Sequence, residues 1–489
     1  MDYLGLTQLT KTQRWVAMEL VRGFSGLLGL AAVAGFSLAT AAPVDPAGTD
    51  KMVAKSQAGS VANPSLALPC DFSGAARPLS LADVAERALC NNPQTREAWA
   101  NARVQAAQVG AAGSAYWPSL SASAALTHNE TDSAGTTRYN QLSAGVSLSY
   151  LLYDFGGRDA TRENARQVLS ALNATQDAAI QSVFLAAVQA YYQLFSAQAA
   201  VAAATQAEKS SLESFKAADA RYGVGAGTPA DKLQAQTAYS QAVLNRITAA
   251  GNANTAQGVL ANVTGLDANA PLSIAPVSVA RPDEAFSQDV ARLIEQARQS
   301  RHELAAAEAQ VKAAQANVNA VQASGMPNFS LTAGVNYNDS SISDPVHSSA
   351  LGVAVSVPLF TGYNTTYRIR AAQEQVEARR AQRDRIGQQV ALDVWKAYQS
   401  LITQMQSLKS SADLLASATQ SEDVALGRYK AGVGNILDVL TAQSALASAR
   451  QQDIQALYGW YIAKAALAQA MGQLDFAAIA SPQAGQRPQ

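Results

Sequence analysis

The sequence has few of the side chains on which enzymes and metal proteins depend. Its 489 residues include three histidines and two cysteines. His128, His302 and His347 have no spacing that suggests a metal cluster or a general base. No serine elbow, zinc signature or nucleophilic cysteine context occurs either. We therefore expect no catalytic residue, no metal site and no cofactor, and hence no enzyme.

Charge is also scarce. Charged residues make up 15% of the chain, and the formal net charge is -1. A protein that binds a polyanion needs a basic surface. Nucleic acid is therefore not an expected partner.

Long apolar runs are missing after the N-terminal region, where no segment has 18 consecutive apolar residues, so no transmembrane helix is expected in the mature protein. At the N-terminus, an apolar run over residues 24–38 follows the basic residues Lys11, Arg14 and Arg22. Small residues at 39–42 complete the pattern of a secretory signal peptide over residues 1–42. A membrane anchor is the alternative, but this run is shorter than the ~20 residues of a spanning helix.

The two cysteines, Cys70 and Cys90, both follow this segment. An oxidising exported compartment would permit a disulfide between them, and two free thiols fit the sequence nearly as well. A lipid anchor on Cys70 is disfavoured, because Pro69 precedes it and the signal segment ends far upstream. Residues 43–78 are rich in Ala, Ser, Pro and Gly, which predicts a flexible N-terminal segment.

What the sequence does contain is a long internal repeat. Residues 221–236 align with residues 428–443, an offset of 207 (428 minus 221), and keep Arg-Tyr, two glycines, an Asp and a Gln in register. Residues 151–154 pair with 358–361 at the same offset. A unit of about 200 residues is too long for a short-repeat solenoid, so it indicates a duplicated domain or half-domain.

Four short windows alternate between apolar and small or polar residues, which predicts β-strands. The clearest window, residues 141–150, places Leu142, Val146 and Tyr150 on one face, opposite small and polar residues. Two β-hairpins follow, one in each half of the repeat. We expect their strands over about 119–128, 141–153, 328–338 and 349–360, with polar loops at 129–140 and 338–348.

Each window is about 10 residues, the length of a tilted strand across a bilayer, and aromatic residues cluster near the ends. A small soluble sheet packed on helices would show the same alternation. The Ser, Thr, Asn and Gly on the second face favour a water-filled lumen. Four strands cannot close a barrel alone, because open edges in lipid leave backbone groups unpaired. Strands that span a membrane therefore require an oligomer.

Most of the remaining sequence is rich in Ala and Gln and has a helical period. Residues 158–220 contain no proline or glycine, and the matching stretch over 365–430 contains only Gly387 and Gly427. Each stretch ends at the repeated glycine motif and is followed by a second helix, so we expect two helical hairpins. The second helices are predicted over 229–263 and 436–471. Shorter helices are predicted over 80–91, 93–114, 283–299 and 301–324, the first with a capping box at Ser80 and Asp83.

The glycine motif Gly223–Gly227 superficially suggests a phosphate-binding loop. It follows a helix, lacks the Gly-Lys-Ser ending and recurs in the other half, so we interpret it as a turn.

These patterns divide the chain into six segments. They are a signal peptide over 1–42, a flexible segment over 43–78, a first repeat over 79–265 with its helical hairpin at 156–265, a connector over 266–282, a second repeat over 283–474 with its helical hairpin at 363–472, and a mobile tail over 475–489.

Together, the signal peptide, the duplicated halves, the alternating strands, the very long helices and the Arg-Tyr-x-x-Gly-x-Gly-x-x-x-Asp-Val-Leu turn at 428–440 resemble the TolC family of outer-membrane channels. The resemblance covers residues 79–474. It implies a mostly α fold with a small β part. Three copies would supply twelve transmembrane strands to one barrel, and their coiled-coil hairpins would extend it as a long α-helical barrel through the periplasm.

In that family the turns between the long helices form a periplasmic gate. Tyr429 and Asp438 stand at the positions of a gate tyrosine and a pore-lining aspartate, and Asp231 stands where the tyrosine's partner on the adjacent helix pair would be. Gly434 replaces a gate arginine and Thr441 a second lining aspartate, which implies a weaker lock. The resemblance also implies that an adaptor docks at the turn tips, marked by Gly225, Gly227, Gly432 and Gly434.

Asp438 is also suited to a pore for an electrostatic reason that does not depend on the resemblance. One carboxylate per chain, repeated by three-fold symmetry around a narrow pore, concentrates negative potential and favours cations. An Asp that complements a helix dipole is the simpler interpretation, and it fits Asp231 equally well.

The resemblance implies a homotrimeric duct in the bacterial outer membrane, in contact with outer-membrane lipid, a periplasmic adaptor and an inner-membrane transporter. Its cargo would be a protein in type I secretion or small molecules in efflux, and the absence of a lipid-anchor cysteine favours secretion. A non-channel structural coiled-coil protein of the envelope is the alternative of a different class. That alternative predicts solubility without detergent and no conductance.

Overall fold

A computed structural model of the chain describes residues 45–53, 78–132, 136–275 and 289–475. The chain divides into two units, residues 1–48 and 49–489, and the elements described here belong to the second. The predicted signal peptide, Cys70 and the tail beyond residue 475 lie outside the described residues.

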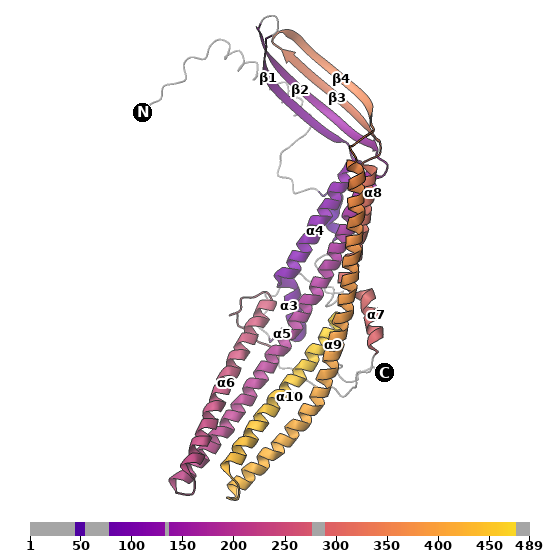
Figure 1. Cartoon of the computed structure of the whole chain (residues 1–489). Coiled ribbons are helices and arrows are strands. Elements are labelled where there is room, and N and C mark those ends of the chain that lie inside the picture. Colours follow the sequence, from indigo (N-terminus) through magenta and orange to yellow (C-terminus); the bar gives the residue numbers. More distant parts are fainter. Residues whose placement is uncertain (1–44, 54–77, 133–135, 276–288, 476–489) are drawn as a thin grey trace, which may run out of the picture. The chain divides into compact units, whose positions relative to one another are not determined.

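Four antiparallel strands form one sheet in the order β1-β2-β3-β4 (Figure 1). They are β1 (Ser119–Asp132), β2 (Thr136–Tyr153), β3 (Asn328–Ser340) and β4 (Ser343–Ser356). Each half contributes one hairpin, as predicted, and the pairing of β2 with β3 joins the two halves.

The strands extend further toward their hairpin turns than the sequence predicts, so most of the expected loops at 129–140 and 338–348 are strand. Polar cross-strand pairs stabilise the β1–β2 extension: Arg138 Nη2 lies 2.7 Å from Glu130 Oε1, and His128 Nδ1 lies 2.7 Å from Asn140 Oδ1. A backbone ladder continues without apolar alternation, which is why the hydrophobic pattern ended too early.

The register gives the sheet two chemically different faces. Residues directly opposite each other share a face. On one face Leu120 pairs with Leu148, Val146 with Val335, and Leu331 with Val353. The other face holds Ser121 opposite Ser147, Gly145 opposite Asn336, and Thr332 opposite Gly352.

Four long helices form two antiparallel hairpins (Figure 1). They are α5 (Gly157–Gly223) with α6 (Pro229–Val263), and α9 (Asn364–Lys430) with α10 (Ile436–Ala470). Helix α5 also packs against α10, so a seam between these two helices joins the hairpins. In the part of the chain that the structure describes, no helix has the length and hydropathy needed to cross a membrane.

Most of the shorter elements pack against α5 or α9. The shorter elements are η1 (Thr49–Met52), α3 (Leu81–Asn91), α4 (Pro93–Gly113), η2 (Ser114–Tyr116), α7 (Val290–Ser300) and α8 (His302–Ala323). The capping box predicted for α3 is present: Asp83 N donates to Ser80 Oγ at 3.2 Å, and Ser80 N donates to Asp83 Oδ2 at 2.9 Å. Within the segment expected to be flexible, η1 is followed by Val53, which is buried in a cluster with residues of α4 and α5.

The largest apolar core among the described residues lies where α5 packs against both α3 and α10. Tyr191 and Phe184 of α5 are fully buried there, and Leu260 of α6 closes the cluster. Cys90 of α3 lies against this core and is disulfide-bonded; the sequence's other cysteine, Cys70, is outside the described residues.

Each passage from strand to long helix contains two consecutive residues in the left-handed region. In the first half they are Phe155 (φ 53°) and Gly156 (φ 89°), and in the second Gly362 (φ 62°) and Tyr363 (φ 63°). The glycine and the aromatic residue have exchanged places between the halves. A left-handed aromatic residue is uncommon and costs backbone strain. The two halves therefore keep the same backbone conformation at this junction even though the residue types at the two positions differ.

Candidate gate at the helical turns

The turns that end α5 and α9 have the same backbone. Gly225 (φ 73°) and Gly432 (φ 77°) take the left-handed conformation at corresponding places. Ala226 N donates to Arg221 O at 2.8 Å, and Val433 N donates to Arg428 O at 3.1 Å. These bonds satisfy carbonyls at the helix ends, as in the Schellman motif. The glycine motif is therefore a helix-terminating turn, as the sequence indicated.

The second glycine of each turn is restricted by close approach rather than by its dihedral angle. A Cβ atom on Gly434 would lie 2.8 Å from Tyr429 N, and one on Gly227 would lie 3.2 Å from Tyr222 N. In this structure, position 434 has no room for the arginine found there in the family that the sequence resembles.

Apolar side chains project from both tips. Val224 is 79% exposed and Val433 is 71% exposed. Each of the two turns of one chain thus exposes an apolar side chain.

Asp231 completes a capping box at the start of α6. Its Oδ2 accepts hydrogen bonds from Thr228 N at 3.1 Å and Thr228 Oγ1 at 2.8 Å, while Asp231 N donates to Thr228 Oγ1 at 3.1 Å. Within the described chain the Asp231 carboxylate therefore bonds Thr228. The predicted contact with Tyr429 of the adjacent helix pair remains a prediction.

Asp438 lies in a different environment. Helix α10 is capped by Asn435, whose Oδ1 accepts from Leu437 N at 3.0 Å. Asp438 follows in the first turn with an exposed side chain, and Thr441, one turn later, is also exposed, with Oγ1 donating to Leu437 O at 2.8 Å. Because Asn435 caps α10, the carboxylate of Asp438 is not used as a cap, and its side chain is exposed.

Tyr429 is almost fully buried, with 8% of its surface exposed. It packs at the tip end of the seam with Ala218, Ala235, Ile436 and Val439, a cluster that draws on both hairpins. Its counterpart in the first half, Tyr222, is 42% exposed. The two tyrosines of the repeated motif thus have different surroundings.

Sequence reasoning missed one residue of this region, Arg221. Its guanidinium carbon lies 4.9 Å from the centre of the Tyr429 ring, and its Nη1 donates to Tyr429 O at 3.4 Å. The Arg-Tyr motif drew attention to this position, but only packing shows which arginine reaches which tyrosine.

A salt bridge closes the first hairpin beside this contact. Lys232 Nζ lies 2.7 Å from Asp219 Oδ1, and the hydrogen bond with Asp219 raises the pKa of the Lys232 ammonium. It links α5 to α6 within one hairpin, not one hairpin to the other.

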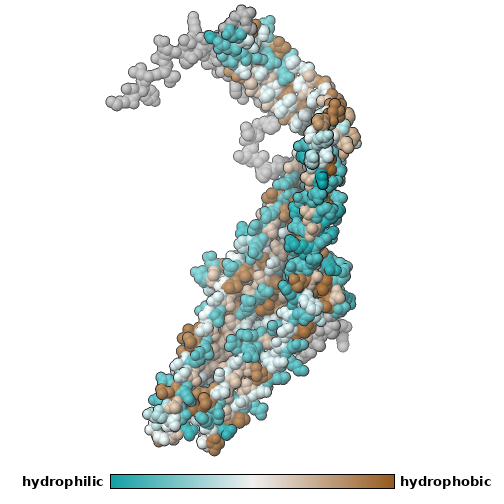
Figure 2. Space-filling model, viewed as in Figure 1, coloured by the Kyte–Doolittle hydropathy of each residue, from teal (hydrophilic) through white to brown (hydrophobic). Residues whose placement is uncertain are grey.

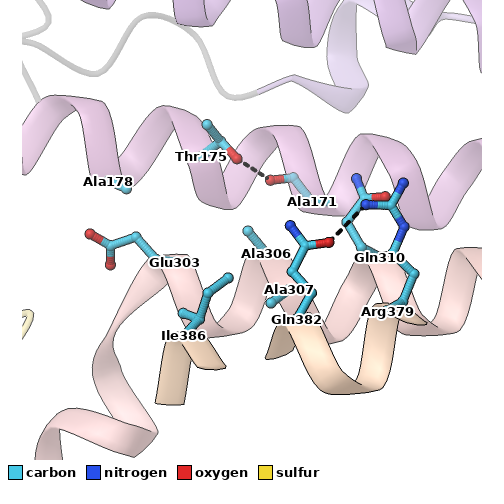
Figure 3. Close-up of a pocket in the computed structure, with 10 residues that line it drawn as sticks. All are labelled: Ala171, Thr175, Ala178, Glu303, Ala306, Ala307, Gln310, Arg379, Gln382 and Ile386. Carbon is cyan, nitrogen blue, oxygen red and sulfur yellow. Dashed lines mark hydrogen bonds between the residues drawn. The ribbon is translucent and has the colours of Figure 1, made fainter. Parts of the chain in front are cut away.

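A cavity of about 270 Å³ lies between α5, α8 and α9 (Figure 3). Alanines such as Ala171 and Ala307 leave the space, and polar side chains border it. These side chains have partners in the chain: Glu303 pairs with Arg301, and Arg379 Nη1 donates to Gln382 Oε1 at 3.0 Å.

Among the described residues, no group of three His, Cys, Asp or Glu side chains could hold a metal ion. We therefore place the candidate site at the turns.

Large apolar side chains are exposed on the sheet and at its junction with the helices, where hydrophobic residues gather in Figure 2. Leu351 on β4 is 77% exposed, and Trp117 and Phe360 beside the junction are each 77% exposed. Exposed apolar surface on this scale marks an interaction with a partner or a membrane.

A sheet with one apolar and one polar face that continues into long helical hairpins with glycine turns defines a class of bacterial envelope channels. The family model described as "Outer membrane efflux protein" matches residues 84–266 and 293–473, and the chain belongs to this family. The predicted resemblance to the TolC family is confirmed, as is localisation in the bacterial outer membrane with a long periplasmic extension of helices.

Individual relatives cover most of the chain. It is 30% identical to protein CyaE of Bordetella pertussis, covering 93% of this chain and 96% of the relative. It is 25% identical to the outer membrane protein TolC of Vibrio cholerae, covering 81% of this chain and 91% of the relative. The solved CmeC outer membrane channel of Campylobacter jejuni shares the fold, with a TM-score of 0.73 at 19% identity over 81% of this chain and 86% of that one.

Proposed function

We propose that three copies of this chain form an outer-membrane channel that serves as the exit duct of a tripartite export system. The observation that carries the proposal is the four-stranded sheet. Its apolar face is exposed, its opposite face is lined by Ser, Thr, Asn and Gly, and β1 and β4 are its edges. In lipid those edges need partners. Pairing β4 of one copy with β1 of the next closes twelve strands around a polar lumen.

The helical hairpins support the same arrangement. Alanine-rich helices approach closely, and three pairs of hairpins side by side would continue the lumen as an α-helical barrel. The exposed aromatic residues at the junction, Trp117, Phe360 and Tyr363, fit the aromatic belt at a membrane surface. The turns would form the periplasmic entrance, with Asp438 and Thr441 facing the pore and Asp231, Tyr429 and Gly434 at the gate.

The partners would be a periplasmic adaptor docked at Gly225, Gly227, Gly432 and Gly434, and an inner-membrane transporter. We propose protein export by type I secretion as the main role. A relative from Pseudomonas aeruginosa, 25% identical over 69% of this chain, is named alkaline protease secretion protein AprF, which supports this role. The family description supports small-molecule efflux as the second candidate. A structural, non-channel role would not explain why one face of the sheet is polar while the other is apolar and exposed.

The channel is tested by inserting detergent-purified protein into planar bilayers. Small, discrete, cation-favouring steps are expected from a mostly closed pore. Solubility without detergent together with an absence of steps would favour the structural role. For cargo, deletion of the gene should retain a secreted protein inside the cells if the role is secretion, and should raise sensitivity to toxic small molecules if it is efflux.

The two faces of the sheet supply a matched pair of variants. Leu351 lies on the apolar face and Ala350, its neighbour, on the polar face. Leu351→Arg should prevent stable insertion, because arginine on the lipid face costs about 2–4 kcal/mol near the bilayer midplane. Ala350→Arg should still insert and should reduce the preference for cations. Equal tolerance of both changes would contradict the assignment of lipid and lumen faces.

A further inference from the structure

The two hairpins of one chain meet mainly along the seam between α5 and α10. On α5, Ser214, Ala218 and Arg221 are spaced i, i+4, i+7, so they share one helix face. All three contact the second hairpin: Ser214 reaches Gln443, Ala218 packs against Tyr429 and its neighbours, and Arg221 reaches Tyr429.

Arg221 makes the contact closest to the turns. Its guanidinium lies over the Tyr429 ring, and its Nη1 donates to the Tyr429 carbonyl in the last turn of α9. Carbonyls at a helix C-terminus carry negative partial charge, and a cation near them is favourable. A cation over a buried aromatic face adds a second attraction. One side chain of the first hairpin thus caps a helix of the second.

The nearby carboxylates are engaged elsewhere. Asp219 pairs with Lys232 at 2.7 Å, and Asp231 accepts hydrogen bonds from Thr228. The seam near the turns is therefore not fastened by these acids. Two turns of α5 further from the tip, Ser214 Oγ and Gln443 Nε2 lie 3.1 Å apart, and Gln443 Nε2 also donates to Glu422 Oε1 at 3.5 Å.

The two halves differ at this position. Arg428, the counterpart of Arg221, is exposed. Tyr222, the counterpart of Tyr429, is 42% exposed, and Lys232 of its own hairpin, not an arginine, lies over its ring at 5.3 Å. If the Arg-Tyr motif served only to end the two long helices, both arginines would have the same surroundings. The asymmetry assigns a separate task to Arg221.

We infer that Arg221 is a positioning residue that latches the two hairpins of one chain together at their turns, through the ring and the backbone carbonyl of Tyr429. The inference rests on the proposed channel function for its consequence: release of the latch lets the α9–α10 hairpin move from the α5–α6 hairpin and widens the entrance. The resemblance places a gate arginine at position 434, where this chain has glycine. In this chain it is Arg221 that contacts Tyr429.

The latch is tested by the distance between the two tips, which does not depend on conductance. Spin labels attached to Val224→Cys and Val433→Cys, both exposed positions, report that distance in the purified full chain. Protein without the added cysteines, handled without reductant, gives the background. Arg221→Ala should lengthen and broaden the distance distribution, and the matched control Arg428→Ala should leave it unchanged.

Substitutions at Tyr429 separate the latch from a hydroxyl-based lock. Tyr429→Phe keeps the ring and the carbonyl, so the tip distance should stay the same, whereas Tyr429→Ala should lengthen it. A distance unaffected by Arg221→Ala, or affected equally by Arg428→Ala, would overturn the latch.

Bilayer conductance of the same variants reports on the channel separately. Arg221→Ala should raise the mean conductance severalfold and Arg428→Ala should not. A longer tip distance in a protein that never conducts would support the latch and contradict the channel. Normal channels with an unchanged tip distance would contradict the latch alone.

Discussion

Gly227 and Gly434 occupy the same place in the two turns, and at both positions a Cβ atom would lie close to the backbone nitrogen of a tyrosine five residues earlier. The approach is closer in the second turn, 2.8 Å at Gly434 against 3.2 Å at Gly227. The turn that bears Tyr429, the proposed gate tyrosine, is therefore the more restricted one. The tight closure of this turn also explains why position 434 is a glycine.

Gly434→Ala should therefore destabilise the second turn, because a Cβ atom 2.8 Å from Tyr429 N forces the backbone to shift. Overpacking of this kind typically costs about 1–3 kcal/mol. Limited proteolysis should show faster cleavage near residues 430–436. Gly223→Ala is the control, since a Cβ atom there meets no atom within 4 Å. Equal cleavage of the two variants would show that the turn can absorb a side chain at position 434.

The predicted gate pair yields a second test. Asp231→Ala combined with Tyr429→Phe removes the carboxylate and hydroxyl that would meet between neighbouring helix pairs, so the leak through the closed channel should increase. A loss of about 1 kcal/mol from the closed state corresponds to roughly a fivefold change in the ratio of open to closed channels. Single-channel recordings in planar bilayers measure this ratio.

The control for that experiment is Thr228→Ala. Asp231 also belongs to the capping box of α6, and losing the cap alone costs about 1 kcal/mol. Thr228→Ala removes the cap but keeps the carboxylate. If Thr228→Ala leaks as much as the double variant, the effect comes from the lost helix cap. Unchanged conductance in the double variant would contradict a gate role for Asp231 and Tyr429.

Selectivity provides a test of Asp438 and Thr441. If three copies of Asp438 line the entrance, Asp438→Asn should lower the preference for cations, while Thr441→Asp, one helical turn away, should increase it. The reversal potential under a salt gradient measures both shifts. Glu213→Gln, an exposed carboxylate of α5, should leave selectivity unchanged. A reversal potential that is unchanged in Asp438→Asn but shifted in Glu213→Gln would contradict the assignment of α10 to the pore lining.

Much of this architecture was predictable from the sequence. The helix expected over 229–263 is α6 with the same bounds, and the starts of α5 and α9 fall within one residue of those expected. Long stretches without proline or glycine, closed by repeated glycines, leave few alternatives to helical hairpins. The strands were predicted correctly in number and pairing within each half. They were predicted too short where polar residues continue the backbone ladder, and the fourth was predicted too long, since β4 ends at Ser356 and not at 360.

The latch and the strand-to-helix junctions were not predictable in the same way. Helices rich in alanine have no marked apolar stripe, so the sequence does not reveal that the face bearing Ser214 and Arg221 meets the second hairpin. The left-handed conformations of Phe155 and Tyr363 have no sequence signal, because aromatic residues rarely adopt them. Both features depend on contacts between segments far apart in the chain.

The aromatic cluster of the main core predicts how stability depends on alkaline pH. Burial raises the pKa of Tyr191 to about 12, with a smaller contribution from the charge of Asp83, and burial also raises the pKa of Tyr192. Below pH 10 both the folded and the unfolded states keep these protons, so stability does not change with these groups. Between pH 10 and 12 the unfolded chain loses the protons while the folded protein retains them, and stability falls as the pH rises.

Tyr191→Phe isolates this effect. The thermal midpoint of the wild type, followed by circular dichroism, should fall from pH 10 upward, with Tyr191 responsible for about 2 kcal/mol by pH 12. Tyr191→Phe removes one of the ionising groups and should make that fall less steep, while Tyr222→Phe, at the exposed turn, should follow the wild type. Identical slopes for wild type and Tyr191→Phe would mean that the core admits water and ionises this tyrosine without unfolding.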